Sequence, residues 1–397
     1  MLDRRQLLRL TGACSIAGMA LAAPRALLAA APTGRRLVVV ILRGAMDGLA
    51  AVPPFADPAY AATRGPLALP ESGLRPLDQR FALHPALATF GDWYERGQAL
   101  AVHAVATPYR QRSHFDGQDL LENGPAAPRG MAEGWLNRAL GLMGGRGSRL
   151  GLAVGSSTPL ILRGPVPVAG WAPQRWPEPG DDLIERLADL YAGDPALGPV
   201  FLAGIDASRE VERLADGMGP ERLGGGAPQI RRMAEQVGRL LAAADGMRVA
   251  VLELNGWDTH AGQGGLDGRL ANQLGILDGA LAGLRQALGV AWRESAVVCI
   301  TEFGRTAAAN GSGGTDHGTA SVALLAGGRV EGGRVLADWP GLEPTRLLDG
   351  RDLAPTADLR SLLKAVLVDH QGLEADGVER VVFPGGGAER LRDLVAA

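Results

Sequence analysis

Short apolar runs rich in valine, isoleucine and leucine recur along the chain, and longer segments with helical spacing separate them. Runs of this kind are typical of strands that are buried on both faces of a sheet. Strands are predicted at 37–42, 99–106, 248–254, 297–302 and 319–326, with a weaker strand pair within 150–164. The alternation of strands and helices favours an α/β fold with a mostly parallel, doubly wound sheet.

The helical segments divide into connections between strands and one larger group without a strand. Helices are predicted at 84–97, 113–124, 134–143, 183–191, 200–216, 230–244, 261–288 and 353–370. The group at about 165–245 contains no reactive cluster, and we expect it to be a helical cap or covering insertion. Residues 32–397 are otherwise predicted to form a single domain.

The first 31 residues have the organisation of an export signal. A charged head with Arg4 and Arg5 precedes an apolar stretch at 10–23, and an alanine-rich exit follows at 29–31. This pattern is typical of a secretory signal and not of a spanning helix. The adjacent arginines favour the twin-arginine (Tat) translocase over the general secretory route. We therefore expect a periplasmic or otherwise exported protein, with no later segment apolar enough to span a membrane.

Composition excludes several classes of chemistry. The net charge of −3 argues against a nucleic-acid surface or an anionic membrane surface. Lys364 is the only lysine and lies in a predicted helix, which argues against a P-loop and against a Schiff-base mechanism. The leader holds Cys14, so only Cys299 remains after its removal. An internal disulfide, a thiolate zinc site and an iron–sulfur cluster are therefore not expected.

Acidic and histidine side chains follow three of the predicted strands. Asp47 lies just after the first strand, Asp258 and His260 follow the strand at 248–254, and Glu302 ends the strand at 297–302. Because the carboxyl ends of parallel strands share one edge of a sheet, these side chains can meet there. In an extended D-x-H segment both side chains point the same way and can reach one ion. The structural alternatives are a helix cap for Asp47 and a metal-free hydrogen-bonded pair for Asp258 and His260.

Two polar loops can close over this edge. A glycine-rich loop delivers Asp316 and His317, and a second loop leads Ser113, His114 and Asp116 into a helix. Ser113 can simply cap that helix. A serine at a helix N-terminus is also placed to attack an anionic substrate, because the helix dipole and the free N–H groups attract anions there.

Together these oxygen and imidazole donors suffice for one or two divalent ions, with zinc, manganese, calcium and magnesium as candidates. The predicted ligands are Asp47, His114, Asp116, Asp258, His260, Glu302, Asp316 and His317. Arg305 is expected to neutralise charge on the substrate, and its alternative role is a salt bridge to a neighbouring carboxylate. The other histidines, His84, His103 and His370, are predicted to have structural roles.

Six segments carry a resemblance to a known family. They are the leader, L-R-G-A-M-D-G, R-S-H-F-D-G-Q, W-D-T-H, T-E-F-G-R-T and N-G-S-G-G-T-D-H-G, in this order along nearly the whole chain. The sequence resembles the DUF1501 family of Tat-exported bacterial proteins, which is grouped with the alkaline-phosphatase/sulfatase superfamily. The resemblance implies an alkaline-phosphatase-like, three-layer α/β/α sandwich with a metal site at the C-terminal rim of its sheet.

The resemblance also implies roles for particular residues. The positions that match metal ligands of the superfamily are Asp47, Asp258, His260, Asp316 and His317. Ser113 lies near the place of the superfamily's nucleophile, and Thr107 is a rival for that role. Glu302 is followed by Phe303 where the superfamily has a histidine, so one imidazole is missing. A formylglycine sulfatase is not expected, because the sequence contains no C-x-P-x-R motif.

The sequence thus predicts an exported metal-dependent hydrolase that acts on phosphate or sulfate esters. Ser113 or a water molecule activated by the metal would attack, and Arg305 would steady a small anionic substrate. The alternative is a non-catalytic envelope binding protein that reuses the fold with a structural metal site. A redox protein is disfavoured, because cysteine clusters and a dinucleotide-binding fingerprint are absent from the sequence.

Overall fold

The structure of the protein is a computed structural model. It describes residues 34–125, 127–128, 130–144, 150–155, 157–172, 181–191, 193–195, 197–214, 226–243, 247–385 and 387–396. The predicted export signal at 1–31 lies outside the described residues.

A nine-stranded sheet runs through the described part of the chain, in the order β10-β4-β9-β8-β1-β7-β5-β6, with β11 beside β4. Its strands are β1 (Arg36–Arg43), β4 (Ala99–Ala106), β5 (Gly151–Val154), β6 (Ala169–Trp171), β7 (Val249–Asn255), β8 (Ser295–Ile300), β9 (Ser321–Ala326), β10 (Arg334–Leu336) and β11 (Ala357–Asp358). Strand β9 is antiparallel to its neighbours β4 and β8, and the other pairings are parallel. A separate antiparallel pair joins β2 (Arg75–Pro76) to β3 (Ala82–Leu83). The predicted mostly parallel sheet is confirmed.

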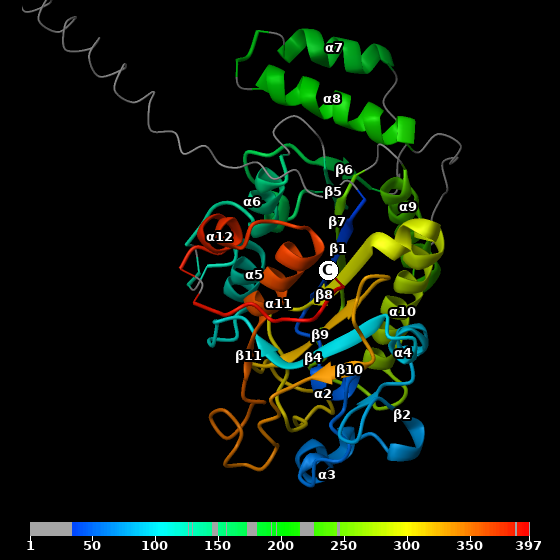
Figure 1. The fold of residues 1–397 in the computed structure, drawn as a ribbon, viewed down its shortest axis with the longest axis vertical. Helices are drawn as coiled ribbons and strands as arrows, with labels where there is room; N and C mark the ends of the chain where they lie inside the picture. The colour runs from blue at the N-terminus through cyan, green and yellow to red at the C-terminus, as the bar shows by residue number, and fades with distance from the viewer. Residues whose placement is uncertain are drawn as a thin grey trace, which may run out of the picture.

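Helices cover both faces of the sheet (Figure 1). Helices α4, α9 and α10 lie on one side, and α5, α6, α11 and α12 lie on the other. Their bounds are α2 (Gly48–Ala51), α3 (Tyr60–Arg64), α4 (Ala88–Glu95), α5 (His114–Asn123), α6 (Trp135–Leu142), α7 (Asp181–Tyr191), α8 (Leu197–Leu214), α9 (Ala227–Ala242), α10 (Arg269–Leu288), α11 (Leu359–Ala365) and α12 (Ala375–Gly377).

Alternate residues of β1 enter two separate cores. Val38 and Val40 pack with the layer that contains α4, α9 and α10, whereas Leu37 and Val39 pack with the layer that contains α5, α6 and α11. Side chains of a strand alternate between faces, so a strand that is covered on both sides must be apolar throughout. The predicted three-layer α/β/α sandwich is therefore confirmed.

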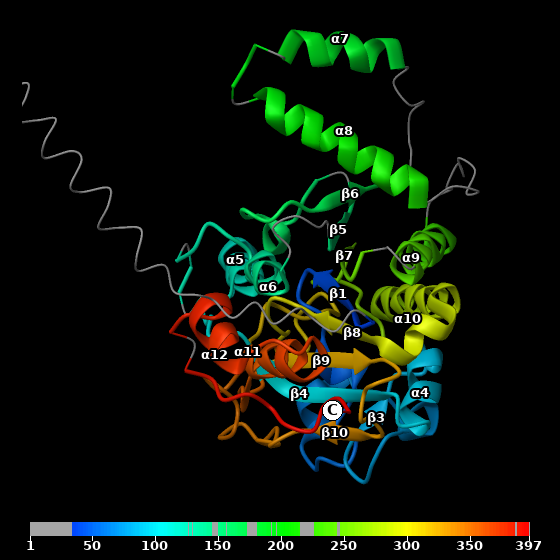
Figure 2. The same cartoon turned by 45° about the horizontal axis from the view of Figure 1, so that its top comes forward.

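The predicted insertion at about 165–245 begins with β6 and continues into helices. Helices α7 and α8 form a pair that projects beyond the β6 edge of the sheet (Figure 2). Helix α9 instead packs along α10 in the body. The proposed cover over the site stays a prediction, since several parts of the insertion lie outside the described residues.

One described segment, Arg269–Glu294, is long and apolar enough to cross a membrane by length and composition. This corrects the expectation that no segment after the leader would meet that criterion. The segment contains α10, whose residues Leu270, Leu274 and Leu277 belong to the core with α4 and α9. Its apolar composition is thus explained by burial between the sheet and neighbouring helices.

The predicted strand pair within 150–164 is wrong. Strand β5 ends at Val154, a single 3-10 turn occupies Leu160–Leu162, and the partner strand β6 comes later in the chain. Pro159 directly precedes that turn, and a proline there has no N–H to donate to a sheet. The short apolar run Leu160–Leu162 is buried as a turn and not as a strand.

The sheet register brings three strand ends together. Arg43 at the end of β1 pairs with Asn255 at the end of β7. On the other side of β1, Ile41 pairs with Ile300 at the end of β8. The loops that follow these three central strands therefore leave the sheet from the same rim.

Candidate metal centre

Three imidazole rings meet at this rim. They belong to His114, the first residue of α5, to His260 in the loop after β7, and to His317 in the loop between β8 and β9. The Nε2 atom of His317 lies 2.9 Å from Nε2 of His114 and 2.9 Å from Nε2 of His260. Nitrogen atoms from three separate segments thus point at one small volume.

The opposite nitrogen of each ring has an acceptor of its own. His114 Nδ1 lies 2.8 Å from Oε1 of Glu302, and His317 Nδ1 lies 2.9 Å from the carbonyl oxygen of Arg112. His260 Nδ1 lies 3.3 Å from Oδ1 of Asp316. A carboxylate or carbonyl accepts hydrogen bonds, so each Nδ1 is placed to donate, and in a neutral ring with that tautomer Nε2 keeps the lone pair that can bind a metal. Converging lone pairs repel one another unless a cation lies between them, and this is how histidines are held around a metal ion.

Asp258 adds oxygen donors to the imidazole cluster. Its Oδ1 lies 3.0 Å from Nε2 of His260 and 3.3 Å from Nε2 of His317, and its Oδ2 lies 3.5 Å from Nε2 of His114. Donor atoms of His114, Asp258 and His317 all lie within 4.8 Å of one another. Ligands at 2.0–2.2 Å from a tetrahedral zinc ion are separated by about 3.3 Å. His114, Asp258 and His317 therefore match the spacing of one metal site, and His260 adds a nitrogen 2.9 Å from His317 Nε2 and 3.0 Å from Asp258 Oδ1.

The D-x-H segment directs its side chains as the spacing predicts. Asp258 and His260 lie on the same side, while Thr259 between them is buried and donates a hydrogen bond from Oγ1 to Oε1 of Gln263 at 2.7 Å. Alternation of side chains in an extended segment produces this arrangement. The buried threonine anchors the segment from which both predicted ligands project.

The loop after β8 folds back on itself to place His317. Residues Arg305 and His317 form an antiparallel bridge, and the Gly318 N–H donates to the Gly304 carbonyl at 2.8 Å. A Cβ atom on Gly318 would lie 2.3 Å from the carbonyl carbon and oxygen of Arg305. Such contacts are too close for any side chain, so glycine is required for the two arms of the loop to pair.

Arg305 is buried and pairs with Asp258. Its side chain is 1% exposed and donates to Asp258 Oδ1, to Thr315 Oγ1 at 3.0 Å, and to the Thr315 carbonyl. These contacts agree with the alternative role, a salt bridge to a neighbouring carboxylate, and the expected contact with the substrate stays a prediction. Burial alone would raise the pKa of Asp258, but the ion pair with Arg305 outweighs it and lowers that pKa. The carboxyl group is thus kept ionised, as a metal ligand must be.

Glu302 lies behind His114 as its hydrogen-bond partner. Its Oε1 accepts from His114, from the Gly44 N–H at 2.9 Å and from Gln118 Nε2 at 3.2 Å, and its Oε2 accepts from Thr301 Oγ1 at 3.0 Å. Burial would raise the pKa of Glu302, but the hydrogen bonds, first that from His114, lower it below its ordinary value. Both of its oxygens accept hydrogen bonds, so these contacts favour an orienting carboxylate, and the role as a direct ligand stays a prediction.

Phe303 follows Glu302 at the position where the superfamily has a histidine. The Phe303 ring lies 5.0 Å from the His114 ring and 5.3 Å from the His317 ring, centroid to centroid. It forms an apolar wall behind the cluster, while His114 from α5 supplies the third imidazole. Gly117 permits this contact, because a Cβ atom there would lie 2.9 Å from two carbons of the Phe303 ring.

The pKa values of the two histidines next to Phe303 are shifted in opposite directions. The hydrogen bond to Glu302 is the largest influence on His114 and raises its pKa above the ordinary value, although burial acts the other way. Burial is the largest influence on His317 and lowers its pKa, with the positive field of His114 in the same direction. His317 is therefore favoured in the neutral form that binds metals.

Asp316 also lies behind a histidine. Its Oδ1 accepts from His260 Nδ1 and from Asn310 Nδ2, at 3.3 Å and 3.1 Å. The hydrogen bond from Asn310 is the largest of the influences that lower the pKa of Asp316. Asn310 also donates to the carbonyl oxygen of His260 at 2.9 Å, which ties the glycine-rich loop to the D-x-H segment. These contacts favour an orienting role, and the predicted ligand role of Asp316 stays a prediction.

Two other predicted ligands have partners elsewhere. Asp47 is buried and caps α2 through the Leu49 N–H, while its Oδ2 pairs with Arg64 and accepts from Gln263 Nε2 at 2.7 Å. The metal role predicted for it is corrected to the helix-cap alternative, because these donors occupy both of its oxygens. Asp116 accepts from the Tyr109 hydroxyl at 3.4 Å and does not join the three-imidazole group.

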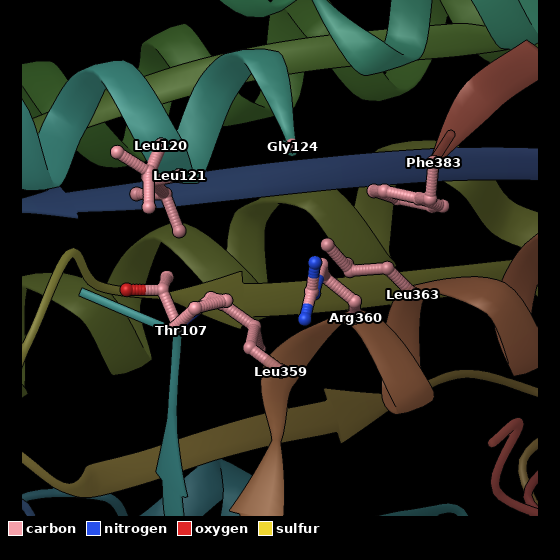
Figure 3. Close-up of a pocket in the computed structure, with 9 residues that line it drawn as sticks. Thr107, Leu120, Leu121, Gly124, Leu359, Arg360, Leu363 and Phe383 are labelled. Carbon is pink, nitrogen blue, oxygen red and sulfur yellow. The ribbon is translucent and has the colours of Figure 1, made fainter. Parts of the chain in front are cut away.

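The two candidate nucleophiles differ in their surroundings. Ser113 is the N-cap residue of α5, as predicted by position, but its side chain makes no capping hydrogen bond. It directly precedes His114. Thr107 is buried and lines a small cavity between α5 and α11 with Leu120 and Leu359 (Figure 3). None of the three clustered imidazoles lines that cavity, so Ser113 is the better placed of the two.

The histidines that were assigned structural roles are buried and bound to the backbone. His84 Nε2 lies 3.1 Å from the Gly265 carbonyl, and His103 Nε2 lies 2.9 Å from the Val52 carbonyl. His370 Nε2 lies 2.8 Å from the carbonyl oxygen of Arg36. Each ring has a nitrogen beside a carbonyl oxygen, and Nδ1 of His84 and of His103 also has a backbone partner, whereas Nδ1 of His370 is buried without one among the described residues.

The site contains a backbone group and two side chains that the sequence analysis did not indicate. The carbonyl oxygen of Arg112 receives the hydrogen bond from His317, and Arg112 has a positive φ of 62°. A backbone carbonyl belongs to every residue, and side-chain identity carries no signal of its direction. Asn310 and Gln118 were also missed, although both are polar residues within the quoted motifs or close to them.

Comparisons with known proteins confirm the family resemblance. The model of the family described as "Protein of unknown function (DUF1501)" matches residues 78–382. A search of curated proteins found no match to the chain. Several solved structures are similar to it in fold, at low sequence identity.

One is the C-terminal periplasmic domain of EcEptC from Escherichia coli, with 13% identity, coverage of 90% of this chain and 88% of that chain, and a TM-score of 0.37. Another is the phosphonate monoester hydrolase of Agrobacterium radiobacter, with 13% identity, coverage of 90% and 78%, and a TM-score of 0.32. A third is BT1596, a 2-O GAG sulfatase, with 12% identity, coverage of 91% and 76%, and a TM-score of 0.36.

Proposed function

The chain belongs to the DUF1501 family of proteins of unknown function, and we propose that it is an exported hydrolase that binds one transition-metal ion and cleaves phosphate or sulfate esters. The observation that carries the proposal is the convergence of three Nε2 atoms beside Asp258, with every Nδ1 atom held by an acceptor. A metal-free cluster would need a proton between those nitrogens or an Nε2–H donated to Asp258, whose Oδ1 lies 3.0 Å from His260 Nε2. The three acceptors at Nδ1 support the proposal, because they favour a proton on the outer side of each ring.

The donor set favours zinc among the candidate metals. His114, His260 and His317 offer nitrogen, and Asp258 offers oxygen. Imidazole suits zinc and neighbouring transition metals, whereas calcium and magnesium prefer sites made of oxygen atoms. One ion is proposed in place of one or two, since only one ligand cluster occurs within the described ranges.

When bound, such an ion polarises an ester oxygen and activates a water molecule or hydroxyl group. The chain's own residues prepare the site for that chemistry. Arg305 keeps Asp258 ionised and oriented, and Glu302 fixes the tautomer of His114. Ser113 offers a hydroxyl group at the start of α5 that is not used as a helix cap, so it is the proposed nucleophile.

Phe115 supports a substrate with an organic portion. Its side chain is 89% exposed and follows His114 directly on the first turn of α5. A single exposed apolar side chain is ordinary on a protein surface, so it is the position of Phe115 beside His114 that suggests a contact with substrate. We propose that Phe115 contacts the apolar or ring-shaped part of an ester, while the metal side of the site takes the anionic group.

A second candidate is a non-catalytic binding protein with a structural metal site. It is favoured by the arginines near the cluster, whose guanidinium groups already have partners. Arg110 donates to backbone carbonyls, Arg112 to Asp349 and Asp352, and Arg305 to Asp258 and Thr315. An anionic substrate would therefore depend on the metal ion for most of its charge compensation.

An ester screen separates the two candidates. The zinc-loaded full chain is assayed against aryl phosphate, phosphodiester, phosphonate and sulfate esters, next to Ser113→Ala and Asp258→Asn. The hydrolase proposal predicts turnover of at least one class that both variants reduce by 100-fold or more, a typical scale for loss of a nucleophile or catalytic metal. Zinc binding without turnover of any class would favour the binding protein. Export through the Tat translocase is proposed from the leader alone.

A further inference from the structure

The carbonyl group that orients His317 belongs to a residue with an unfavourable backbone conformation. Arg112 has a φ of 62°, in the left-handed region, and its carbonyl oxygen accepts from His317 Nδ1 at 2.9 Å. A non-glycine residue in this region is strained and persists only where surrounding contacts hold it. Those contacts therefore determine where the acceptor for His317 lies.

The Arg112 side chain is held by two carboxylates on one distant loop. Its Nε donates to Oδ2 of Asp352 at 2.7 Å, and one terminal nitrogen donates to Oδ2 of Asp349 at 3.0 Å. The side chain of Asp352 is fully buried, whereas that of Asp349 is 67% exposed. An exposed pair contributes little, while a buried charge-assisted hydrogen bond is strong and costly to break. Asp352 is thus the dominant anchor of Arg112.

Asp352 is itself fixed by the rest of the protein. Its Oδ2 accepts from Thr319 Oγ1 at 2.8 Å, and its Oδ1 accepts from a terminal nitrogen of Arg351 at 3.2 Å. Its backbone pairs with Leu348, and it forms a bridge with Thr306, the residue after Arg305. Thr319 lies two residues after His317 in the same loop. The carboxylate therefore joins the loop that carries His317 to the segment that carries its acceptor.

We propose that Asp352 is a positioning residue of the metal site, acting through Arg112 on His317. It holds the Arg112 carbonyl where it fixes the Nδ1–H tautomer of His317 and aims Nε2 at the ion. The inference rests on the proposed metal-binding function and deepens it. Orienting partners of this kind commonly change metal affinity by 10–100-fold when they are removed. Sequence spacing gives no sign of the role, since Asp352 lies outside every motif at the strand ends.

The test compares zinc affinity among full-length variants by competition with a chromogenic chelator. Asp352→Asn removes the negative charge that holds Arg112 and turns an amide N–H₂ group toward the donors at Oδ2, Arg112 and Thr319, or toward Arg351 at Oδ1. We expect zinc binding 10–100-fold weaker than wild type. Asp349→Asn is the matched control at the exposed partner, and we expect less than about a threefold change. Arg112→Ala removes the anchored side chain from the surface and should weaken zinc binding as Asp352→Asn does.

Two further measurements make the outcomes distinguishable. Circular dichroism of each metal-free variant tests folding, and the visible spectrum of the cobalt(II)-loaded protein reports ligand geometry. A weaker affinity with an altered cobalt spectrum in a folded variant supports the positioning role. Wild-type affinity in folded Asp352→Asn or Arg112→Ala overturns it while leaving the metal site standing. Absence of zinc binding by the wild type overturns both proposals.

Discussion

Replacing Glu302 with glutamine tests whether this carboxylate orients a metal-binding imidazole. The change keeps the size and shape of a fully buried side chain. The glutamine carbonyl can still accept from His114, Gly44 and Gln118, and its amide can donate to Thr301 Oγ1. The fold should therefore survive, while the negative charge opposite the His114 Nδ1–H is lost.

The size of the effect follows from that one hydrogen bond. A hydrogen bond to a charged group contributes about 1.5–3 kcal/mol and a neutral one about 0.5–1.5 kcal/mol. Exchanging one for the other at the 2.8 Å contact between His114 and Glu302 costs about 1–1.5 kcal/mol. Since 1.4 kcal/mol corresponds to a factor of ten, zinc affinity should fall roughly tenfold.

The assay is zinc affinity by chelator competition, with thermal unfolding of the metal-free proteins as the test of folding. Glu253→Gln is the matched control, because Glu253 lies near the end of β7 and pairs with Arg43 and not with an imidazole. It should leave zinc affinity within about a factor of two. The reasoning is refuted if folded Glu302→Gln binds zinc as tightly as wild type, or if Glu253→Gln weakens binding equally.

Three other changes test different parts of the account. Burial lowers the pKa of His103 from 6.5 to about 4, so the unfolded chain binds more protons than the folded chain between these pH values. The free energy of unfolding should therefore fall by up to about 3 kcal/mol as the pH drops from 6.5 towards 4. Urea unfolding of wild type and His103→Asn at pH 7 and 4.5 checks this, and equal losses in both proteins would contradict it. Gly117→Ala forces a Cβ atom to 2.9 Å from the Phe303 ring, so it should lower the free energy of unfolding by about 1–2 kcal/mol and weaken zinc binding. The control Gly275→Ala meets open space in α10 and should raise the free energy of unfolding by about 0.5–1 kcal/mol. Equal shifts in the two variants would refute the packing argument. Phe115→Ala should raise KM for an aryl ester about 5–10-fold and leave kcat unchanged, because it loses an exposed aromatic contact of about 1 kcal/mol. An unchanged KM would show that Phe115 does not contact the substrate.

The sequence was informative wherever one local rule decided the outcome. Continuous apolar runs predicted the central strands β1, β4, β7, β8 and β9, because strands covered on both faces must be apolar at every position. The D-x-H spacing predicted that Asp258 and His260 share a side. The parallel sheet then explains why segments that are far apart in the chain meet at one rim.

The sequence could not separate direct ligands from the residues behind them. Glu302, Asp316 and Asp258 all have carboxylate side chains, so residue type does not distinguish their roles. Only the three-dimensional packing places the oxygens of Glu302 and Asp316 next to Nδ1 of the histidines. Asp47 was misassigned for a similar reason, since its partner Arg64 lies 17 residues further along the chain on α3. Burial of opposite charges against each other is a tertiary property that spacing along the chain does not encode.

The central claim is that His114, His260, His317 and Asp258 hold one transition-metal ion. The most direct test is elemental analysis of the protein purified without chelators or added metal, as wild type, His317→Ala and Asp116→Asn. The account predicts about one equivalent of zinc or a related metal in wild type and in Asp116→Asn, and its loss from folded His317→Ala. Metal-free wild type, or calcium retained in all three proteins, would contradict it.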